Sequence, residues 1–110
     1  MNDTTNPQAE RLLRTLGLAA RSGNIAFGCD GCCEAMKQGR ARLVIAADGI
    51  AANTKKRIED RSAFYGVRLV FPGCSPEQLG RALGKKGGVA AAAVTDASLA
   101  RAVILSYEKQ

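Results

Sequence analysis

The sequence predicts an α/β fold, a three-layer α/β/α sandwich around one roughly four-stranded mixed sheet. Helix-like and strand-like segments alternate along the chain, and turns rich in glycine or proline separate them. The segment 43–47 is apolar on both faces, which is typical of a central strand with helices on both sides. A chain of 110 residues supports one hydrophobic core, so we expect residues 1–110 to form a single domain.

The first elements are predicted from their boundary residues. Asn6 and Pro7 are typical of an N-cap and the first position of a helix, and Gly23 is expected to end that helix. The polar residues 1–5 are expected to be disordered. The next expected elements are a strand at 25–27, a helix over 28–39 and the buried strand at 43–47.

A third helix is expected over 51–65, and its charged residues lie at helical spacing. Lys55 can pair with Glu59, and Lys56 can pair with Asp60, because residues four apart are neighbours on a helix surface. Two further cations have no such partner on this helix, Arg57 and Arg61. We expect these two to be available to a partner molecule.

The start of a fourth helix is marked by a capping box. Ser75 is the expected N-cap, Pro76 the first helical residue and Gln78 the residue that completes the box. The expected elements around this start are a strand at 67–71, the fourth helix ending near Gly84, a strand at 89–95 and a last helix from Asp96 or Ser98 to Tyr107.

The chain carries a net charge of +6, and this positive charge is unevenly distributed. Between Lys37 and Arg68 there are eight basic and three acidic residues. A local excess of this kind attracts polyanions more strongly than the same charge spread evenly. A solubilising surface without a polyanionic partner is the alternative explanation.

Missing residue types exclude several classes of function. The sequence has no histidine, which removes the commonest general base and mixed Cys/His zinc sites. It has no tryptophan, two tyrosines and three phenylalanines, which argues against a stacking platform for single-stranded bases. We therefore expect a protein that is not an enzyme and needs no cofactor. The chain has no signal-peptide pattern and no apolar run near the roughly 20 residues of a membrane span, so we expect a cytoplasmic protein without membrane contact.

The segment 80–86 contains glycines and lysines but does not match a nucleotide-binding P-loop. Three residues separate its glycines where four are required, and no Ser or Thr follows the lysine. Lys85 and Lys86 are expected to interact with a helix C-terminus or to add to the cationic surface. Two carboxylate pairs are interpreted as caps and turns and not as acid–base catalysts: Asp30 with Glu34, and Asp48 with Asp96.

The helix expected over 28–39 begins with a glycine-rich turn. Gly28 and Gly31 allow another backbone to come close, and the unpaired N–H groups of a helix start attract anions. Asp30 is suited to cap this helix or to accept a hydrogen bond from a guanine edge. The turn is therefore a candidate phosphate-binding site, and a capped helix start without a partner is the alternative.

Several segments occur together in one known family. They are LGLAARSG at 16–23, the Gly28 turn, 37–48, NTKK at 53–56, LGRALGK at 79–85 and VTD at 94–96. In this combination they resemble the ribosomal kink-turn RNA-binding family, which includes the archaeal ribosomal proteins L-seven-Ae and L-thirty-e and a bacterial YlxQ-like branch. The resemblance extends from about residue 12 to 104. It implies a monomeric, cytoplasmic ribonucleoprotein component whose partner is RNA, with ribosomal RNA among the candidates.

In that family, the helix after the turn carries the pattern Gly-x-Asn-Glu-x-x-Lys. The Asn and Glu read sheared G·A pairs of a kinked RNA helix, and the Lys contacts the backbone. Gly28 matches the glycine, whereas Asp30, Gly31 and Glu34 replace the other three residues. Asp30 does not donate, Gly31 has no side chain and Glu34 repels phosphate. The resemblance therefore implies a weaker preference for kink-turns, with Lys37 as a partial replacement for the missing cation.

The residues predicted to contact RNA come from the turn, the second and third helices, and the loop before the fourth helix. The resemblance implies that this loop lies beside the turn. The predicted contacts are Gly28, Cys29, Asp30, Gly31, Glu34, Lys37, Arg40, Lys55, Lys56, Gly73, Cys74 and Ser75. Arg57 and Arg61 are further candidates for phosphate contacts.

The four cysteines suggest a second interpretation. Cys29 and Cys32 form a C-x-x-C pattern at a helix start, where the pKa of a thiol tends to fall. If Cys33 and Cys74 lie nearby, the four thiols could hold Zn²⁺ or form a disulfide. The simpler explanation is that Cys32 or Cys33 packs in the core. The sequence thus leaves open a metal-binding or redox module with weakened RNA binding, and a protein–protein adaptor is a third interpretation.

Overall fold

The structure, a computed structural model of the chain, describes residues 7–108. Within this range, five helices alternate with four strands, which confirms the predicted fold class. The helices are α1 (Pro7–Arg21), α2 (Cys29–Lys37), α3 (Ala52–Tyr65), α4 (Pro76–Ala82) and α5 (Ala97–Glu108). The strands are β1 (Ile25–Phe27), β2 (Leu43–Ala46), β3 (Leu69–Val70) and β4 (Ala91–Val94). The predicted N-cap Asn6 and the disorder predicted for residues 1–5 lie outside the described residues.

The four strands form one mixed sheet in the order β1-β4-β2-β3. β4 runs antiparallel to β1 and β2, and β3 runs parallel to β2. The register aligns Phe27, Ile45, Val70 and Ala92 in one row across the sheet. The segments that follow β1, β2 and β3, and the segment that precedes β4, therefore leave the sheet at the same end. We call this the Gly28 end, and it comprises residues 28–31, 47–51, 71–75 and 85–90.

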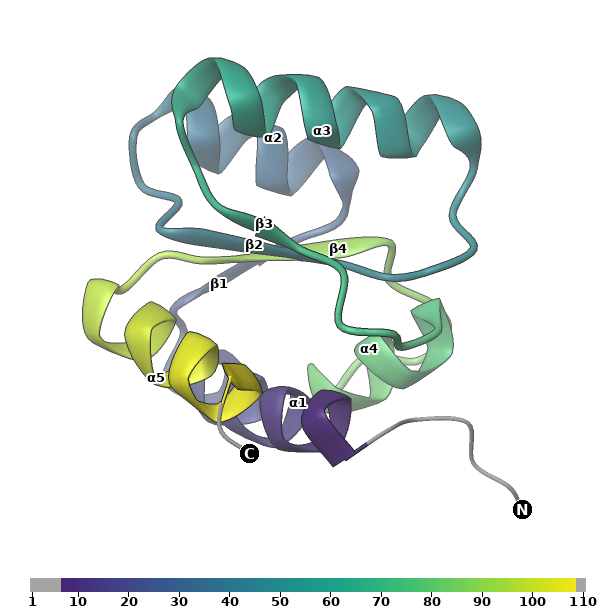
Figure 1. Cartoon of the computed structure of the whole chain (residues 1–110), viewed down its shortest axis with the longest axis vertical. Helices are drawn as coiled ribbons and strands as arrows, with labels where there is room; N and C mark the ends of the chain where they lie inside the picture. The colour runs from purple at the N-terminus through teal and green to yellow at the C-terminus, as the bar shows by residue number, and fades with distance from the viewer. Residues whose placement is uncertain (1–6, 109–110) are drawn as a thin grey trace.

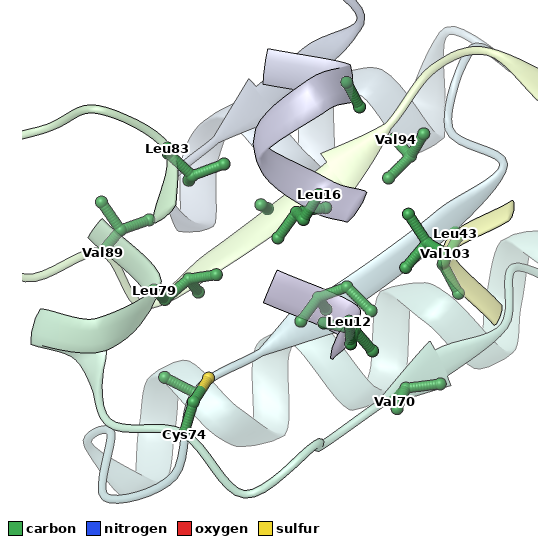
Figure 2. Close-up of a cluster of buried hydrophobic side chains, with 14 of the residues drawn as sticks. Leu12, Leu16, Leu43, Val70, Cys74, Leu79, Leu83, Val89, Val94 and Val103 are labelled. Carbon is green, nitrogen blue, oxygen red and sulfur yellow. The ribbon is translucent and has the colours of Figure 1, made fainter. Parts of the chain in front are cut away.

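Helices cover both faces of the sheet and complete the three layers (Figure 1). α2 and α3 lie on one face, and α1, α4 and α5 lie on the other. β2 is buried along its whole length because Leu43 and Ile45 face the α1 side, whereas Val44 and Ala46 face the α2 side. Figure 2 shows the larger apolar cluster, in which side chains of α1, α4 and α5 pack against the sheet. The sheet is thus a rigid platform from which the loops of the Gly28 end project.

Two strands are shorter than the sequence predicts, because backbone groups at their ends bond elsewhere. The predicted strand 67–71 is reduced to two residues, since the N–H of Val67 donates to Ser62 at the end of α3. The predicted strand 89–95 is reduced to four residues. There, the N–H of Val89 donates to the carbonyl of Pro76 at the start of α4. A local bond at the end of α3 sets the first boundary, and a tertiary bond to the start of α4 sets the second.

The predicted capping box at α4 is confirmed. The N–H of Gln78 donates to the Ser75 hydroxyl at 3.1 Å, and the N–H of Ser75 donates to the Gln78 side chain at 2.8 Å. α5 begins similarly, since the N–H of Leu99 donates to the Asp96 carboxylate at 2.9 Å. Within the described range, no helix has the length and apolar character needed to cross a bilayer.

Candidate nucleic-acid interface

The start of α2 lacks a capping side chain. Gly28 occupies the N-cap position with φ +83°, a conformation that glycine adopts readily and other residues do not. Its own N–H donates to Ala91 at 2.8 Å, which ties the turn to β4. The N–H groups of Cys29, Asp30 and Gly31 have no acceptor among residues 7–108. These groups carry the positive end of the helix dipole and point out of the helix.

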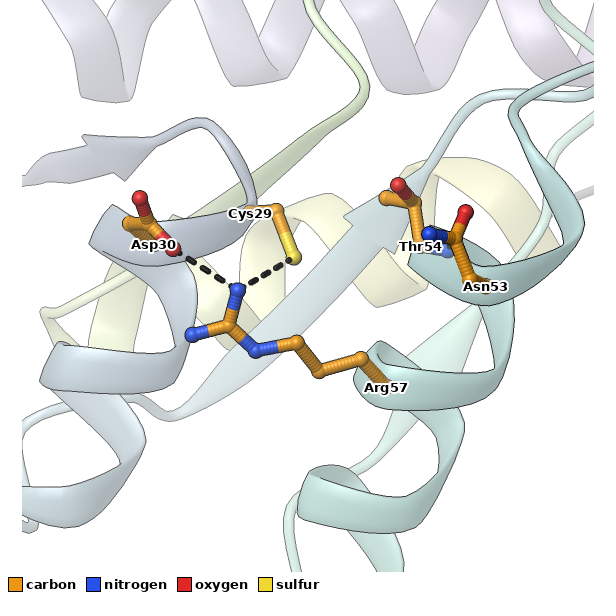
Figure 3. Close-up of polar contacts among 5 residues, drawn as sticks. All are labelled: Cys29, Asp30, Asn53, Thr54 and Arg57. Carbon is orange, nitrogen blue, oxygen red and sulfur yellow. Dashed lines mark hydrogen bonds and ion pairs between the residues drawn. The ribbon is translucent and has the colours of Figure 1, made fainter.

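The start of α3 also lacks an N-cap side chain, because Ala51 occupies that position. The N–H of Thr54 donates to the Asn53 side chain at 2.9 Å, whereas those of Ala52 and Asn53 find no acceptor in the described chain. α2 follows β1 and α3 follows β2, so both helices start at the Gly28 end and pack side by side (Figures 1 and 3). Two unsatisfied helix starts therefore lie at the same end of the sheet.

An ion pair joins the start of α2 to the second turn of α3 (Figure 3). Arg57 of α3 donates to the Asp30 carboxylate at 2.8 Å, and the same nitrogen lies 3.7 Å from the Cys29 sulfur. The prediction that Arg57 is unpaired is therefore wrong, because helical spacing considers partners on one helix only. Asp30 does not cap α2, and its side chain remains 91% exposed. The hydrogen bond to Asp30 raises the pKa of Arg57, which keeps its positive charge at this surface.

Lysines flank the two helix starts on either side. Lys56 pairs with Asp60 at 3.3 Å as predicted. Lys55 lies over the ring of Phe71, 5.3 Å from its centre, and makes no ion pair with the predicted partner Glu59 within the described residues. The sequence predicted the charge at Lys55 but not its aromatic neighbour, because Phe71 comes from a different part of the chain.

Lys85 is a candidate site residue that the sequence did not place at the turn. Its ammonium lies 4.0 Å from the centre of the ring of Phe27, the residue that directly precedes Gly28 in the sequence. The backbone N–H of Lys85 donates to the carbonyl of Gly80 at the end of α4, and the contact with Phe27 is made by the side chain. The spacing of glycines around Lys85 indicates a turn, but only the fold shows that this turn reaches Phe27.

The glycines at the start of α2 face open space. A Cβ added at Gly28 would meet no atom within 4 Å, and one added at Gly31 would meet only the backbone of Ala26 at 4.0 Å. By contrast, a Cβ at Gly80 would lie 2.2 Å from the Gly87 carbonyl oxygen. The small size of Gly28 and Gly31 is therefore not needed for packing inside the described structure, and it leaves their backbone accessible from outside.

Other predicted contacts lie away from the helix start. Lys37 ends α2, and Arg40 follows it, so both are at the opposite end of this helix from Gly28. At about 1.5 Å per residue, the nine-residue helix separates its two ends by roughly 12 Å. Arg40 donates to Gln38 at 2.6 Å, and Gln38 in turn donates to Glu34 at 2.8 Å. A contact by Lys37 or Arg40 would require an RNA that extends along α2.

The loop before α4 lies at the Gly28 end, but two of its side chains have structural roles. The thiol of Cys74 is buried in the cluster on the α1 side, so it does not present the predicted RNA contact. The hydroxyl of Ser75 is used to cap α4. The carbonyl of Cys74 accepts the N–H of Asp48 at 2.8 Å, which fastens the loop to the end of β2. Gly73 remains as the predicted contact with an accessible backbone.

The four thiols do not converge on one point. Cys32 and Cys33 belong to the cluster on the α2 side, whereas Cys74 lies across the sheet. Residues 7–108 contain no group of three or more Cys, Asp or Glu side chains placed to hold a metal ion. Burial raises the pKa of Cys32 to about 12, the opposite of the fall expected at a helix start, and it raises the pKa of Cys74 to about 11. The structure therefore does not support the metal-binding or redox interpretation.

Comparison with known proteins identifies the family. Residues 10–104 match the model of the Ribosomal protein L7Ae/L30e/S12e/Gadd45 family. The chain belongs to this family. That result confirms the resemblance seen in the sequence.

Named relatives and solved structures agree with this assignment. RNA-binding protein YlxQ of Bacillus subtilis (strain 168) is 34% identical over 89 residues, which cover 81% of this chain and 87% of that protein. A structure of a protein of unknown function from Bacillus halodurans C has a TM-score of 0.82 at 30% identity, covering 89% of this chain and 97% of the other. The Giardia lamblia 15.5kD RNA binding protein shares the fold, with a TM-score of 0.76 at 22% identity. That match covers 99% of this chain and 96% of the Giardia protein.

Proposed function

We propose that this protein binds structured RNA without catalysing a reaction, and that the Gly28 end of the sheet is its RNA-binding surface. The observation that carries the proposal is the pair of helix starts at this end, those of α2 and α3, that lack capping side chains. Their free N–H groups are suited to bind phosphate oxygens. Membership of the family and the relative named RNA-binding protein YlxQ support RNA as the anion.

The cations around the two helix starts would supply affinity. Lys55 and Arg57 come from α3 and Lys85 from the loop between α4 and β4, and all three lie at the same end of the sheet. Phosphate contacts of this kind give binding that weakens as salt rises, because counterions are released from the RNA. Selectivity would come from groups that reach base edges, for which the exposed carboxylate of Asp30 is the best placed.

The proposed target is a kinked RNA helix, and ribosomal RNA is the first source to test. The open backbone at Gly28 and Gly31 allows a base or phosphate to approach closely. Glu34 is exposed one turn further along α2 and would oppose phosphate. We therefore propose that the protein prefers kinked RNA over plain duplex. This preference would be weaker than that of a protein with lysine at position 34.

A non-catalytic role is supported by the placement of the carboxylates. Asp48 follows β2 and Asp96 follows β4, and these strands are antiparallel, so the two residues lie at opposite ends of the sheet. Asp96 is used to cap α5. Neither residue is placed to work with the other as an acid–base pair.

The proposal is tested by filter binding with a kink-turn RNA and a plain duplex of equal length. We expect tighter binding to the kinked RNA, and affinity for both that falls steeply between about 50 and 200 mM salt. Affinity that does not change with salt, or equal affinity for both RNAs, would contradict the proposal.

A charge substitution locates the binding surface. Glu34→Lys should increase affinity for the kinked RNA, because it replaces a repelling carboxylate with a phosphate partner. The matched control is Glu59→Lys, which makes the same change of charge at an exposed position in the middle of α3. An equal gain in both variants would indicate a general charge effect, and a loss of affinity in Glu34→Lys would show that the RNA lies elsewhere.

A further inference from the structure

A second basic surface lies between α1 and α4, away from the two uncapped helix starts. Two adjoining hollows, of about 370 and 260 Å³, share Gly17, Arg21, Arg81 and Ala82 in their walls. The larger hollow continues along α1 to Arg14. We call the combined depression the arginine groove.

The arginines of this groove have no partners in the structure. The side chains of Arg14, Arg21 and Arg81 are exposed and make no ion pair or hydrogen bond with any residue from 7 to 108. Other arginines are paired, as shown by Arg57 with Asp30 and by Arg68 with Glu108 at 2.9 Å. One carboxylate, that of Glu10, lines the larger hollow. The groove therefore gathers three guanidinium groups with a net excess of positive charge.

The floor of the groove is made by close contact between the two helices. A Cβ at Gly17 would lie 3.1 Å from the carbonyl oxygen of Ala82 and 3.8 Å from a guanidinium nitrogen of Arg21. Glycine thus lets α1 approach the end of α4 and lets the Arg21 side chain lie back over the contact. The apolar lining of the groove is limited to Leu13, Leu83 and small residues.

The groove continues toward the Gly28 end. The smaller hollow ends at Gly84, and the next residue, Lys85, lies over Phe27 directly before the Gly28 turn. Cations therefore extend from Arg14 along the groove to the proposed RNA-binding surface. A guanidinium group can bind a phosphate through two parallel hydrogen bonds, and a groove without an apolar anchor suits a polyanion better than a folded protein.

We infer that the arginine groove binds a second stretch of sugar–phosphate backbone, in the part of the RNA that extends beyond the Gly28 end. This inference rests on the proposed function, since it assigns the groove to the same RNA. The surface at the Gly28 end would bind the structured or kinked element, and the groove would bind the adjoining arm.

The experiment compares two RNAs, a minimal kinked RNA and the same RNA extended by a duplex arm. The test variant is Arg14→Gln with Arg81→Gln, and the control variant is Arg42→Gln with Arg101→Gln. The control removes the same charge from exposed residues that line a different hollow, beside α5. Thermal unfolding of both variants checks that the fold is retained.

We expect the test variant to lose about tenfold in affinity for the extended RNA while its affinity for the minimal RNA stays within about twofold. For the extended RNA, the plot of log affinity against log salt should become less steep by between about 1 and 2. Each lost phosphate contact reduces the steepness of this plot by up to about 0.9. The control variant should retain the wild-type slope on both RNAs.

Three results would overturn the inference. The first is an equal loss on both RNAs, the second is an equal loss in the control variant, and the third is no loss in the test variant. Polyglutamate of matched charge should compete poorly with the extended RNA; efficient competition would reassign the groove to an acidic protein segment. If wild-type protein binds neither RNA, the proposed function itself fails, which separates that failure from failure of the groove.

Discussion

The helices on the two sides of the sheet begin in different ways. α4 and α5 each begin with a side chain, Ser75 or Asp96, that accepts a backbone N–H of the first turn. α2 and α3 begin with Gly28 and Ala51, which offer no such acceptor. Compared with a capping serine or aspartate, alanine at the N-cap typically costs about 1 kcal/mol and glycine a few tenths, so α3 loses more local stability at its start than α2 does. Both starts lie at the end of the sheet where we place the RNA.

Glycine is used differently on the two sides as well. On the α1 and α4 side, Gly17 and Gly80 are required because another backbone lies within 3.1 and 2.2 Å of where a Cβ would stand. On the α2 side, Gly28 and Gly31 face open space. One layer thus uses glycine for its own packing, whereas in the other layer glycine leaves the backbone open.

The thiols should differ strongly in reactivity. The pKa of Cys32 is raised by burial from 9.0 to about 12, so its thiolate fraction at pH 8 should be about a thousandfold lower than that of an unfolded cysteine. Cys29 is partly exposed at the start of α2 and should be alkylated first. Mass spectrometry of iodoacetamide-treated protein measures the order. Labelling of Cys32 or Cys74 before Cys29 would show that the two layers are not packed as described.

Because burial raises these thiol pKa values, the free energy of unfolding should fall as the pH rises. Cys32 and Cys74 are held neutral by burial, so their contribution is complete below the pKa of an unfolded thiol, near 8.5. It should be lost as the pH rises through about 9 to 12. Cys74→Ala should show a smaller decrease in unfolding free energy over this range than the wild type does.

Two glycine-to-alanine variants should change stability in opposite directions. Gly80→Ala places a Cβ against the Gly87 carbonyl oxygen and should lower the free energy of unfolding by about 3 kcal/mol. Gly31→Ala has room and removes a flexible residue from a helix, so it should raise the free energy by about 0.5 to 1 kcal/mol. Urea denaturation measures both. A large loss in Gly31→Ala would mean that the start of α2 is packed against something in the chain.

Removing a cap should affect folding and leave RNA binding unchanged. Ser75→Ala deletes the hydroxyl that accepts the Gln78 N–H and should cost about 1 kcal/mol of unfolding free energy. RNA affinity at a temperature well below unfolding should equal that of the wild type. A specific loss of affinity would instead show that Ser75 contacts RNA, as the sequence suggested.

Adding a cap at the start of α3 should increase stability and weaken RNA binding. Ala51 has φ −58° and ψ 144°, a non-helical conformation that a capping serine can adopt. Ala51→Ser should gain about 0.5 kcal/mol of stability and lower RNA affinity, because the hydroxyl would occupy N–H groups that the proposal assigns to phosphate. Greater stability with unchanged affinity would remove α3 from the binding surface.

The sequence predicted the fold well because local patterns determine it. The apolar segment at β2 and the capping box at Ser75 each specify one element without help from the rest of the chain. The site was only partly predicted, since its contacts join distant segments. Arg57 bonds Asp30 across 27 residues of sequence, and Lys85 reaches Phe27 through the packing of the loop before β4. Burial of the Cys74 thiol was not predicted, because the direction of this side chain depends on which face of the sheet the loop covers.

The most direct test of RNA binding at the uncapped helix starts is an NMR titration of labelled protein with the kinked RNA, read at the backbone amides that begin α2, α3 and α5. We predict the largest shifts at the uncapped starts, Cys29–Gly31 on α2 and Ala52–Asn53 on α3. We predict much smaller shifts at the capped start of α5, near Leu99. Shifts centred on α5, with the amides of α2 and α3 unchanged, would contradict this prediction.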